Sequence, residues 1–582
     1  MPVPTLHPRL FTHLLAAVAL ATLVLWVFLP TLEHGWAPLD DELNFVSNPH
    51  FRGFSLDHLK WMATHPRGGH YIPLSWVTLA ADFELSGMDP RGYHRTNLLL
   101  HLANALLFYA LAWRLLAWRA EAAVPDAARG LAAFAAAALF AVHPLRVESV
   151  AWITERRDVL CGFFVLLSLH SYLRAAGAAG RRRSLAWAGV LLAFTAALLS
   201  KGIALVLPVA FLALDLHPLG RLRLDPRGRL STGARSVLLE KLPFLVLSAV
   251  IACVTFWAAA PAMADRTQAG LEHRLLAAGL SLSFYLEKTF LPVAIPFQVP
   301  VLRPLTFTGD PDAVLRGLGF LAVLAAALVL WRRRPAVPLA LAVFTAFVLP
   351  VSGLFQAGPQ LVAHRYTYLS ALPLALLAGA GLQALARRAG RRYGRRGLAI
   401  LALLTCGLAA ALAGAARAQT GLWRDDVTFC RAAAEAEPGA SAPTGALARA
   451  YLARGEQGAA LAVLQDGRRR IPDALLLPYL EAVLLATSPD DHLRDGELAL
   501  LLATQVARAT SYQDPAALFA LVVANAETGD LAAARHWLDG AMALTRAGRK
   551  AEFLPVLETA SRQIEAQGLV RLTATDWKNT PL

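Results

Sequence analysis

Charged residues are scarce in this chain of 582 residues. They account for 16% of the sequence, whereas hydrophobic residues account for 56%. Soluble domains carry about 25% charged residues, so the composition argues against an ordinary soluble protein. Cysteine is rarer still, because the chain has 4 and no two of them form a CxxC pair. The sequence therefore indicates neither a disulfide framework nor a zinc site.

Acidic residues are fewer than basic ones, which gives a net charge of +14. Nucleic-acid binding would need a basic face with interleaved aromatic residues, and the sequence has no such face. The arginines instead gather in short loops beside apolar runs, at 181–183, 221–235, 332–334 and 387–396. Such loops stay on the cytoplasmic side of a membrane. We therefore expect the positive charge to orient a membrane protein, with no nucleic-acid partner.

Apolar runs of about 17–21 residues recur from Leu10 to about Ala416, and this length crosses a bilayer. The first run, 10–29, is too long for a signal peptide and lacks a following cleavage site, so we expect a retained span with a cytoplasmic N-terminus. We do not count the apolar run at 275–293 as a span, because one more span would place the arginines at 332–334 on the extracytoplasmic side of the membrane. The segment 261–312 is then an outer loop with an interfacial helix. Eleven spans are predicted, at roughly 10–30, 97–113, 130–143, 158–173, 184–200, 203–216, 241–260, 315–331, 336–355, 366–385 and 396–416.

A second kind of loop alternates with the Arg-rich kind and mixes acids, histidines, arginines and aromatics. Because the basic loops are cytoplasmic, the mixed loops must open on the opposite face. The first of them, 31–95, is long and rich in polar side chains. This gathering predicts an active site on the outer face of a multi-pass membrane protein, with 1–418 as its transmembrane domain.

Two adjacent carboxylates, Asp40 and Asp41, stand near the start of the first outer loop. Neighbouring carboxylates at a membrane rim repel each other, so their presence suggests a function. One could take a proton from an acceptor hydroxyl, and the other could orient it or hold a cation. Alternatively, the pair is the solvated start, or the N-cap, of a surface helix.

Cationic side chains follow in the later outer loops, where planar guanidinium groups and a lysine suit phosphate. Four cations are predicted to bind a donor phosphate: Arg146, Arg156, Lys201 and Arg365. Four further residues are predicted to support them: His143, Glu148, Asp158 and His364. Each cation also has a structural alternative. The arginines could pair with nearby carboxylates, the lysine could reach lipid headgroups, and the arginine beside tyrosines could anchor the membrane interface.

Several stretches also resemble a known family. They include "LDDELNFVSNPHFRGFSLDHLKWM", "LFAVHPLRVESVAWITERRDVLCGFF", "LLSKGIALVLPVAFLALDLHPL" and "GPQLVAHRYTYLSALPLALL". Over about residues 35–375 the chain resembles bacterial multispanning proteins with tetratricopeptide (TPR) tails. These are related to the transmembrane-and-TPR O-mannosyltransferases of animals, within the GT-C glycosyltransferases. Two positions depart from the family pattern: Arg157 stands where Lys is frequent, and Gly202 stands where Pro is frequent.

This resemblance implies a GT-C-like fold, a polyprenyl-phosphate sugar donor and a catalytic Asp in the first outer loop. The catalytic role falls on Asp40 or Asp41, with Asp40 favoured. Some members of such families use a divalent metal, so Mg or Mn at this pair is implied as a possible cofactor. The resemblance also implies that His143, Arg146 and Glu148 lie near the site.

From about residue 419 the apolar spans stop and a helical region rich in Ala and Leu begins. It contains one copy of the 34-residue TPR pattern and a weaker copy at 525–538. We expect 419–582 to be a TPR-like helical domain on the outer face that binds a protein or peptide acceptor. The alternative is a plain helical bundle that caps the membrane domain. The residues that carry the TPR signature are Tyr451, Ala460, Leu464 and Pro472.

The predicted fold is thus all-α, with a polytopic membrane helix bundle of about eleven spans before a TPR-like solenoid. The predicted function is transfer of a mannose-like sugar from a polyprenyl-phosphate carrier to a hydroxyl, best a protein Ser or Thr, on the extracytoplasmic face. The alternative function is a non-catalytic membrane scaffold whose repeats recruit envelope proteins. A transporter is disfavoured, because the spans show neither paired broken helices nor an internal repeat.

Overall fold

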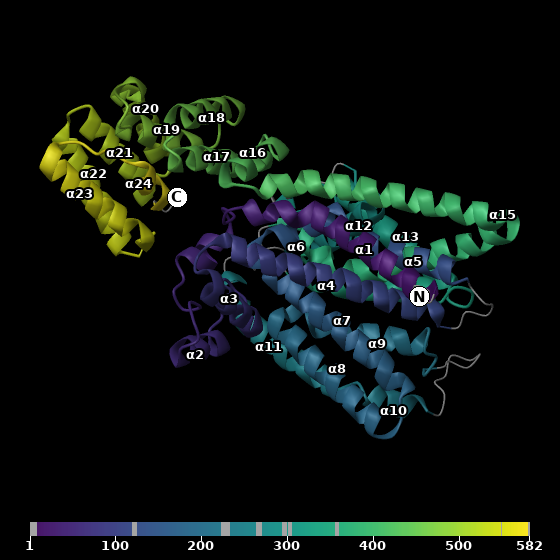
Figure 1. The fold of residues 1–582 in the computed structure, drawn as a ribbon. Coiled ribbons are helices and arrows are strands. Elements are labelled where there is room, and N and C mark those ends of the chain that lie inside the picture. Colours follow the sequence, from purple (N-terminus) through teal and green to yellow (C-terminus); the bar gives the residue numbers. More distant parts are fainter. Residues whose placement is uncertain are drawn as a thin grey trace, which may run out of the picture. The chain divides into compact units, whose positions relative to one another are not determined.

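The computed structural model describes residues 8–118, 125–222, 233–263, 270–293, 299–300, 305–355, 360–548 and 550–579. Within them the chain is almost entirely helical (Figure 1), which confirms the predicted class. The described strands are β1, Val299–Pro300, and β2, Gln360–Val362, which pair antiparallel. The chain divides into two compact units, Met1–Arg424 and Asp425–Leu582. Each unit is described by itself.

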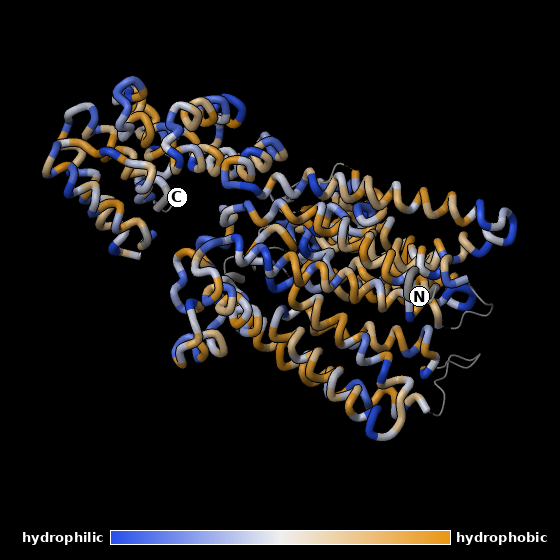
Figure 2. The backbone as a smooth tube through the Cα atoms, viewed as in Figure 1, coloured by the Kyte–Doolittle hydropathy of each residue, from blue (hydrophilic) through white to orange (hydrophobic). Residues whose placement is uncertain are grey.

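Long apolar helices make up most of the first unit. Their outward faces carry leucine and valine side chains, such as Leu192 at 75% and Val329 at 83% exposure, as expected where lipid replaces water. Figure 2 shows hydrophobic residues along these helices and hydrophilic residues near their ends. Seven described stretches are long and apolar enough to cross a membrane: Thr12–Glu33, Pro90–Ala117, Ile153–Gly177, Gly180–Ser200, Ala234–Ala260, Pro311–Val329 and His364–Trp423.

The other predicted spans take less regular forms. Helix α5, Asp126–Ala141, and the segment Pro144–Ala151 qualify together but meet at a bend of 54°. Two shorter apolar stretches, Gly202–Leu216 and Ala336–Val351, cover the predicted spans 203–216 and 336–355. Helix α12, Leu271–Phe290, lies in the predicted outer loop 261–312 and packs on α13, Pro311–Val329. The protein is therefore multi-pass. The described residues contain seven stretches that could span a membrane by length and composition, or eight with the bent pair, compared with the eleven spans predicted.

Helix α15, Thr367–Thr420, contains two of the predicted spans. Gly394 interrupts it with φ 59° and ψ −141°, a backbone conformation that favours glycine. At Gly397 a Cβ atom would approach the Ala389 carbonyl oxygen to 2.7 Å, so the chain is tightly folded here. Figure 1 shows α15 doubling back on itself. The arginines at 387–396 therefore lie at the turn between two long apolar helices.

The first outer loop is itself folded. It contains η1, Leu29–Glu33, η2, Glu42–Val46, α2, Leu56–Thr64, and α3, Pro73–Ser86, before α4 begins at Pro90 and runs to Ala117. A small core of aromatic residues, including Phe45, Phe51 and Trp76, holds these pieces together. The loop is thus a compact cap rather than an extended connector.

The second unit is a series of antiparallel helix pairs with one continuous apolar core. Of the predicted TPR signature residues, Ala460 and Leu464 are fully buried, Tyr451 packs at the edge of the core, and Pro472 is exposed after α18. The assignment of these pairs as true TPR repeats stays a prediction. The helices are α16, Asp426–Ala436, α17, Ser441–Ala453, α18, Gln457–Arg470, α19, Leu476–Thr487, α20, Gly496–Ala509, α21, Pro515–Glu527, α22, Leu531–Arg546, α23, Leu554–Gln567, and α24, Ala574–Asn579.

Candidate active site

Between α5 and α7, Arg156–Gly177, the chain forms three short helical pieces instead of an open loop. These are η3, Pro144–Arg146, α6, Val147–Ala151, and η4, Ile153–Glu155. Pro144 occupies the first helical turn, and the Nδ1 atom of His143 accepts a hydrogen bond from the Leu145 amide at 3.1 Å. Every residue of 143–162 is buried. The carboxylates of this segment are therefore held in fixed positions inside the protein.

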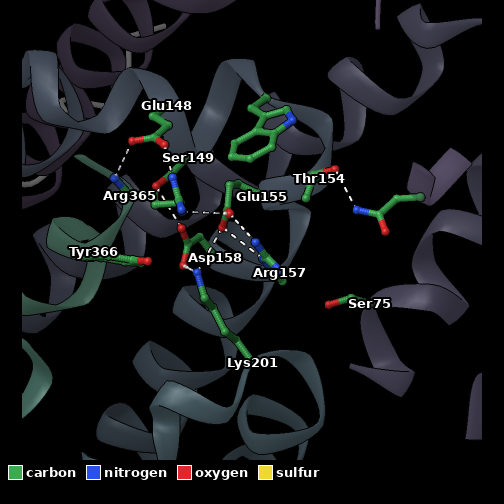
Figure 3. Close-up of polar contacts among 12 residues, drawn as sticks. Ser75, Glu148, Ser149, Thr154, Glu155, Arg157, Asp158, Lys201, Arg365 and Tyr366 are labelled. Carbon is green, nitrogen blue, oxygen red and sulfur yellow. Dashed lines mark hydrogen bonds and ion pairs between the residues drawn. The ribbon is translucent and has the colours of Figure 1, made fainter. Parts of the chain in front are cut away.

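Glu155 is the centre of a buried group of charges (Figure 3). We call this group the ionic cluster; it consists of Glu148, Glu155, Arg157, Asp158, Lys201 and Arg365. The Glu155 side chain is fully buried and contacts three cations. Its oxygens lie 2.6 Å from Nη2 of Arg157, 2.9 Å from Nζ of Lys201 and 3.3 Å from Nε of Arg365. A carboxylate buried to this extent is stable only because the cations replace its lost hydration.

Lys201 follows the last residue of α8, Gly180–Ser200, and its side chain is 14% exposed. Its Nζ lies 2.6 Å from Oδ1 of Asp158, whose Oδ2 accepts a hydrogen bond from Ser149 at 3.0 Å. Ser75 of the first loop donates to the Ser200 carbonyl at 2.9 Å and so fixes the turn. Lys201 therefore pairs with carboxylates rather than reaching lipid headgroups.

Arg365 comes from η8, His364–Tyr366, far along the chain. Its backbone N–H donates to Oε2 of Glu148 at 2.9 Å, and its guanidinium forms an ion pair with the same carboxylate. The guanidinium carbon lies 5.4 Å from the Trp152 ring centroid and 4.9 Å from that of Tyr366. The side chain is 10% exposed, so Arg365 and Lys201 keep a small accessible part at the edge of the cluster.

His70 is a further residue at this cluster, and the sequence analysis did not select it. It lies in the exposed loop before α3. The charge of Arg157, partial removal from water and the charge of Lys201 together lower the pKa of His70 well below its ordinary value. Its imidazole is therefore neutral at pH 7. The stretch "HYIPLSW" belongs to the first loop, but nothing in its spacing links it to residues 155–201.

The two carboxylates of the first loop have different environments. Asp41 is fully buried, and its oxygens accept hydrogen bonds from the Ala37 amide at 2.8 Å and from the Thr154 amide and hydroxyl at 3.1 and 2.6 Å. Burial raises the pKa of Asp41 to about 7, although these hydrogen bonds oppose the rise. Asp40 is exposed. Asp41 thus ties the loop to η4, which ends in Glu155, while Asp40 stays accessible.

Asp41 makes no capping hydrogen bond to the start of η2. The N-cap alternative is therefore wrong for its side chain. Both oxygens of Asp41 already accept hydrogen bonds from N–H or O–H donors. Among the residues that the structure describes, no group of three His, Cys, Asp or Glu side chains is placed to hold a metal ion. A metal at Asp40 and Asp41 stays a prediction, and no reaction step is derived through one.

Arg156 is turned away from the ionic cluster. Its guanidinium pairs with Asp82 at 2.5 Å, donates to the Tyr93 carbonyl at 2.9 Å, and bonds Asn97. The side chain is fully buried. Its predicted role in binding a donor phosphate therefore has no support in the geometry, since its donors are already used to join α3, α4 and α7.

Arg156→Lys should consequently lower the free energy of unfolding by about 1–3 kcal/mol, because lysine loses the charge-assisted bonds of the guanidinium fork. The KM for a donor should not change in the protein that remains folded. Thermal unfolding in detergent, followed by tryptophan fluorescence, measures the first effect. The exposed Arg91 at the start of α4 provides the matched control, Arg91→Lys, with no expected change. A raised donor KM in Arg156→Lys at unchanged stability would return Arg156 to the binding site.

Arg146 lies beside the cluster in a mostly aromatic setting. Its guanidinium carbon is 5.9 Å from the ring centroids of both Phe140 and Tyr368, and Nη2 donates to Thr367. Its Nε and Nη1 atoms have no hydrogen-bond partner among the described residues. Two buried donors thus remain available for an anion. His143 and His364 are buried in the same region.

The structure therefore brings most of the predicted site residues together at the ionic cluster, and two of them lie away from it. Glu148, Asp158, Lys201 and Arg365 belong to the ionic cluster, Arg146 lies next to it, and Asp41 is linked to it through Thr154. Arg156 has a structural position, and Asp40 lies on the exposed side of the first loop. Glu155 and Arg157 were not among the predicted site residues, yet they form the centre of the cluster.

An apolar cavity of about 200 Å³ lies farther along the same helices. Val165 and Leu169 on α7 line it, two to three turns beyond Asp158, and Leu369 and Leu372 on α15 line it from one turn beyond Arg365. Parts of α4, α9, Leu207–Leu216, and α14, Ala336–Val348, complete the wall. The cavity is therefore at membrane depth on helices that carry the ionic cluster at one end.

Several known proteins match part of this sequence. No protein-family model matches the chain. The chain is 32% identical to protein O-mannosyl-transferase Tmtc3 of Drosophila melanogaster over 127 residues. This match covers 20% of this chain and 14% of that protein. It is 35% identical over 146 residues to human protein O-mannosyl-transferase TMTC1 (23% and 15%), and 38% identical over 110 residues to human TMTC4 (18% and 15%). The chain is homologous to these proteins over that stretch.

The match spans about one seventh of the length of these relatives. One solved structure that the chain resembles is ArnT from Cupriavidus metallidurans bound to undecaprenyl phosphate. The TM-score is 0.32 with 14% sequence identity, and the match covers 81% of this chain and 79% of that one. A TM-score this low carries no argument about the fold, which rests on the helices described above.

Proposed function

We propose that the first unit is a membrane glycosyltransferase. It would move a mannose-like sugar from a polyprenyl-phosphate carrier to a hydroxyl acceptor, such as a protein Ser or Thr, on the extracytoplasmic face. The observation that carries this proposal is the ionic cluster at one end of α7, α8 and α15. Lys201 and Arg365 come from distant parts of the chain, are fixed by buried carboxylates, and keep an accessible edge.

The cations would act on the leaving group. When the acceptor oxygen attacks the anomeric carbon, the bond from that carbon to the phosphate oxygen breaks and the carrier phosphate gains negative charge. Lys201 and Arg365 are held before the reaction begins, so they can stabilise this charge without reorganising. The two open donors of Arg146 would add to the binding of the phosphate. Glu155 and Asp158 keep the cations charged and in place.

The proton of the acceptor hydroxyl needs a base on the other side of the sugar. Asp40 is exposed and lies next to Asp41, which bonds to Thr154 beside Glu155. Asp40 would accept the proton as the acceptor oxygen attacks, and Asp41 would position it. Such a displacement inverts the configuration at the anomeric carbon.

The apolar cavity supports a lipid-linked donor. A polyprenyl chain needs an apolar surface, whereas its phosphate needs cations. The cavity wall on α7 and α15 begins one to two turns from the ionic cluster, a separation of about 5–10 Å along a helix. One donor molecule could therefore place its phosphate at the cluster and its first isoprenoid units in the cavity.

The proposal is tested by transfer of labelled sugar from polyprenyl-phosphate mannose to envelope proteins, with the purified chain in nanodiscs. Label should appear on Ser or Thr of the acceptor, and Lys201→Gln should lower the rate by about ten- to a hundredfold, the worth of a charge-assisted contact. Control protein with Arg91→Lys should match the wild type. If no polyprenyl-phosphate sugar donates with any envelope acceptor, the proposal fails and a membrane scaffold becomes the better reading.

The same proposal requires the ionic cluster and the second unit to be extracytoplasmic. Tags placed after Leu582 and within 387–396 should report opposite sides of the membrane. The reason is that the second half of α15, from Gly394 to Thr420, is long enough to cross a bilayer of about 30 Å between these positions. Cysteine labelling in intact cells and in opened vesicles measures this. A tag after Leu582 that is labelled only in opened vesicles would contradict the orientation.

A further inference from the structure

The innermost helices of the second unit are buried on every side. In α19 each residue from Leu477 to Thr487 is buried, and in α21 each residue from Pro515 to Ala526. Helix α19 contacts both α17 and α21, and the three helices form an inner row. In stacked helix pairs such a row lines the concave face, which is normally open to ligands. Something must therefore cover this face in the structure.

The covering element is the end of the chain itself. Helix α23 ends at Gln567, and after Gly568 residues 569–573 run without regular structure and lead into the short helix α24. Helix α24 packs on α17, at the opposite end of the inner row from α23. Three side chains of this segment are almost completely buried: Val570 at 2%, Leu572 at 5% and Trp577 at 1% exposure.

The contacts of this segment are those of a bound extended peptide. The side-chain amide of Gln563 bonds the backbone of Arg571 twice, donating to its carbonyl at 3.3 Å and accepting from its N–H at 2.9 Å. The Leu572 N–H donates to the Thr487 carbonyl at 3.1 Å. The Arg571 guanidinium donates to Glu527 at 2.6 Å and to the Ala486 carbonyl at 3.1 Å. In peptide recognition of this kind, hydrogen bonds to the peptide backbone provide affinity, and pockets for its side chains provide specificity.

The segment does not fill all the space beside it. An open cavity of about 480 Å³ borders Thr573 and Ala574 on one side and residues 455–459 on the other. The indole N–H of Trp577 has no hydrogen-bond partner among the described residues.

We infer that the inner face of the second unit is a peptide-binding site, and that residues 569–579 occupy it as a ligand in cis. The peptide that it fits is an extended segment with an arginine between two aliphatic residues, followed by a tryptophan six positions after the arginine. Glu527 recognises the arginine, and Gln563 and Thr487 hold the backbone. This inference is independent of sugar transfer, since it uses only residues of the second unit.

The experiment compares the full chain with a chain ending at Gly568, both in detergent. The probe is a fluorescent synthetic peptide of residues 569–582. It should bind the shortened chain at least tenfold more tightly than the full chain, because a tethered competitor has an effective concentration in the millimolar range. In the shortened chain Glu527→Gln should weaken binding about ten- to a hundredfold, as expected for loss of a charge-assisted bond. The exposed Glu497 of the same unit provides the control Glu497→Gln, with no change.

Two further experiments distinguish a loss of peptide recognition from a defect in folding. A peptide carrying Arg571→Ala should lose affinity with the wild-type shortened chain but little more with Glu527→Gln, since both changes remove one contact. A full chain with a protease site inserted between Gly568 and Leu569 is cut after folding, and its severed segment should exchange for the labelled peptide. A folded shortened chain that does not bind the peptide, or a cut chain that never exchanges its segment, would overturn the inference.

Discussion

Asp40→Asn should lower the rate of sugar transfer by about 100- to 10,000-fold, the usual contribution of a general base, and leave the protein folded. The amide cannot accept the proton of the acceptor hydroxyl. Because Asp40 is exposed, a nearly isosteric change there should alter the free energy of unfolding by no more than about 0.5 kcal/mol. Transfer of labelled sugar and thermal unfolding of the same preparations measure the two quantities.

Asp41→Asn should show the reverse pattern. Its carboxylate accepts from three donors, on Ala37 and Thr154, and an amide would turn its own N–H₂ group toward at least one of them. Leaving a buried donor without an acceptor costs about 1–3 kcal/mol, so the midpoint of unfolding should fall. The exposed Asp57 in the same loop gives the control Asp57→Asn, with neither effect. Full activity in Asp40→Asn would remove Asp40 from the mechanism.

The second large effect is expected at Glu155. Glu155→Gln should lower the free energy of unfolding by about 3–5 kcal/mol, because it leaves buried cations without their carboxylate. The matched control is Glu287→Gln on α12. Glu287 also contacts two cations, Lys288 at 3.0 Å and Arg316 at 2.9 Å, but is 37% exposed. Exposed ion pairs contribute about 0–1 kcal/mol, so the control should hardly change the unfolding midpoint.

A double variant distinguishes the loss of the Glu155–Lys201 interaction from general destabilisation of the protein. Combining Glu155→Gln with Lys201→Gln removes one charge of each sign, so its effect should be smaller than the sum of the single effects by about 0.5–3 kcal/mol. Unfolding midpoints of the four proteins in one detergent provide the cycle. Additive effects would mean that Glu155 and Lys201 do not depend on each other, and the cluster could not preorganise the cations as proposed.

The membrane class and the general position of the site could be predicted from the sequence. Apolar runs longer than about 17 residues have few stable places outside a bilayer, and the runs at 366–385 and 396–416 reappear as the two halves of α15. The mixed loops were expected to meet at one face, and Lys201, Asp158 and Arg365 do meet in the structure. The count of spans was harder to predict, since several apolar helices are short or bent.

The roles of neighbouring residues could not be predicted in the same way. Asp40 and Asp41 are adjacent, and the catalytic role fell on either of them with Asp40 favoured. Arg156 and Arg157 are adjacent too, and Arg156, not Arg157, was among the predicted phosphate-binding residues. Successive residues in a helical turn point about 100° apart, so neighbours meet different surroundings: Asp41 is buried and Asp40 exposed, and the two buried arginines meet different partners. Arg157 therefore reaches Glu155, whereas Arg156 reaches Asp82 on α3.

The sequence by itself thus determined that this is a helical membrane protein with polar loops and a helical tail, because hydropathy and charge act locally along the chain. Only the tertiary structure decided which charges pair. Arg365 and Glu148 are 217 positions apart, and residues 569–579 cover helices that begin about a hundred positions earlier. Contacts at such separations depend on how helices pack in space, and no local pattern in the sequence records that packing.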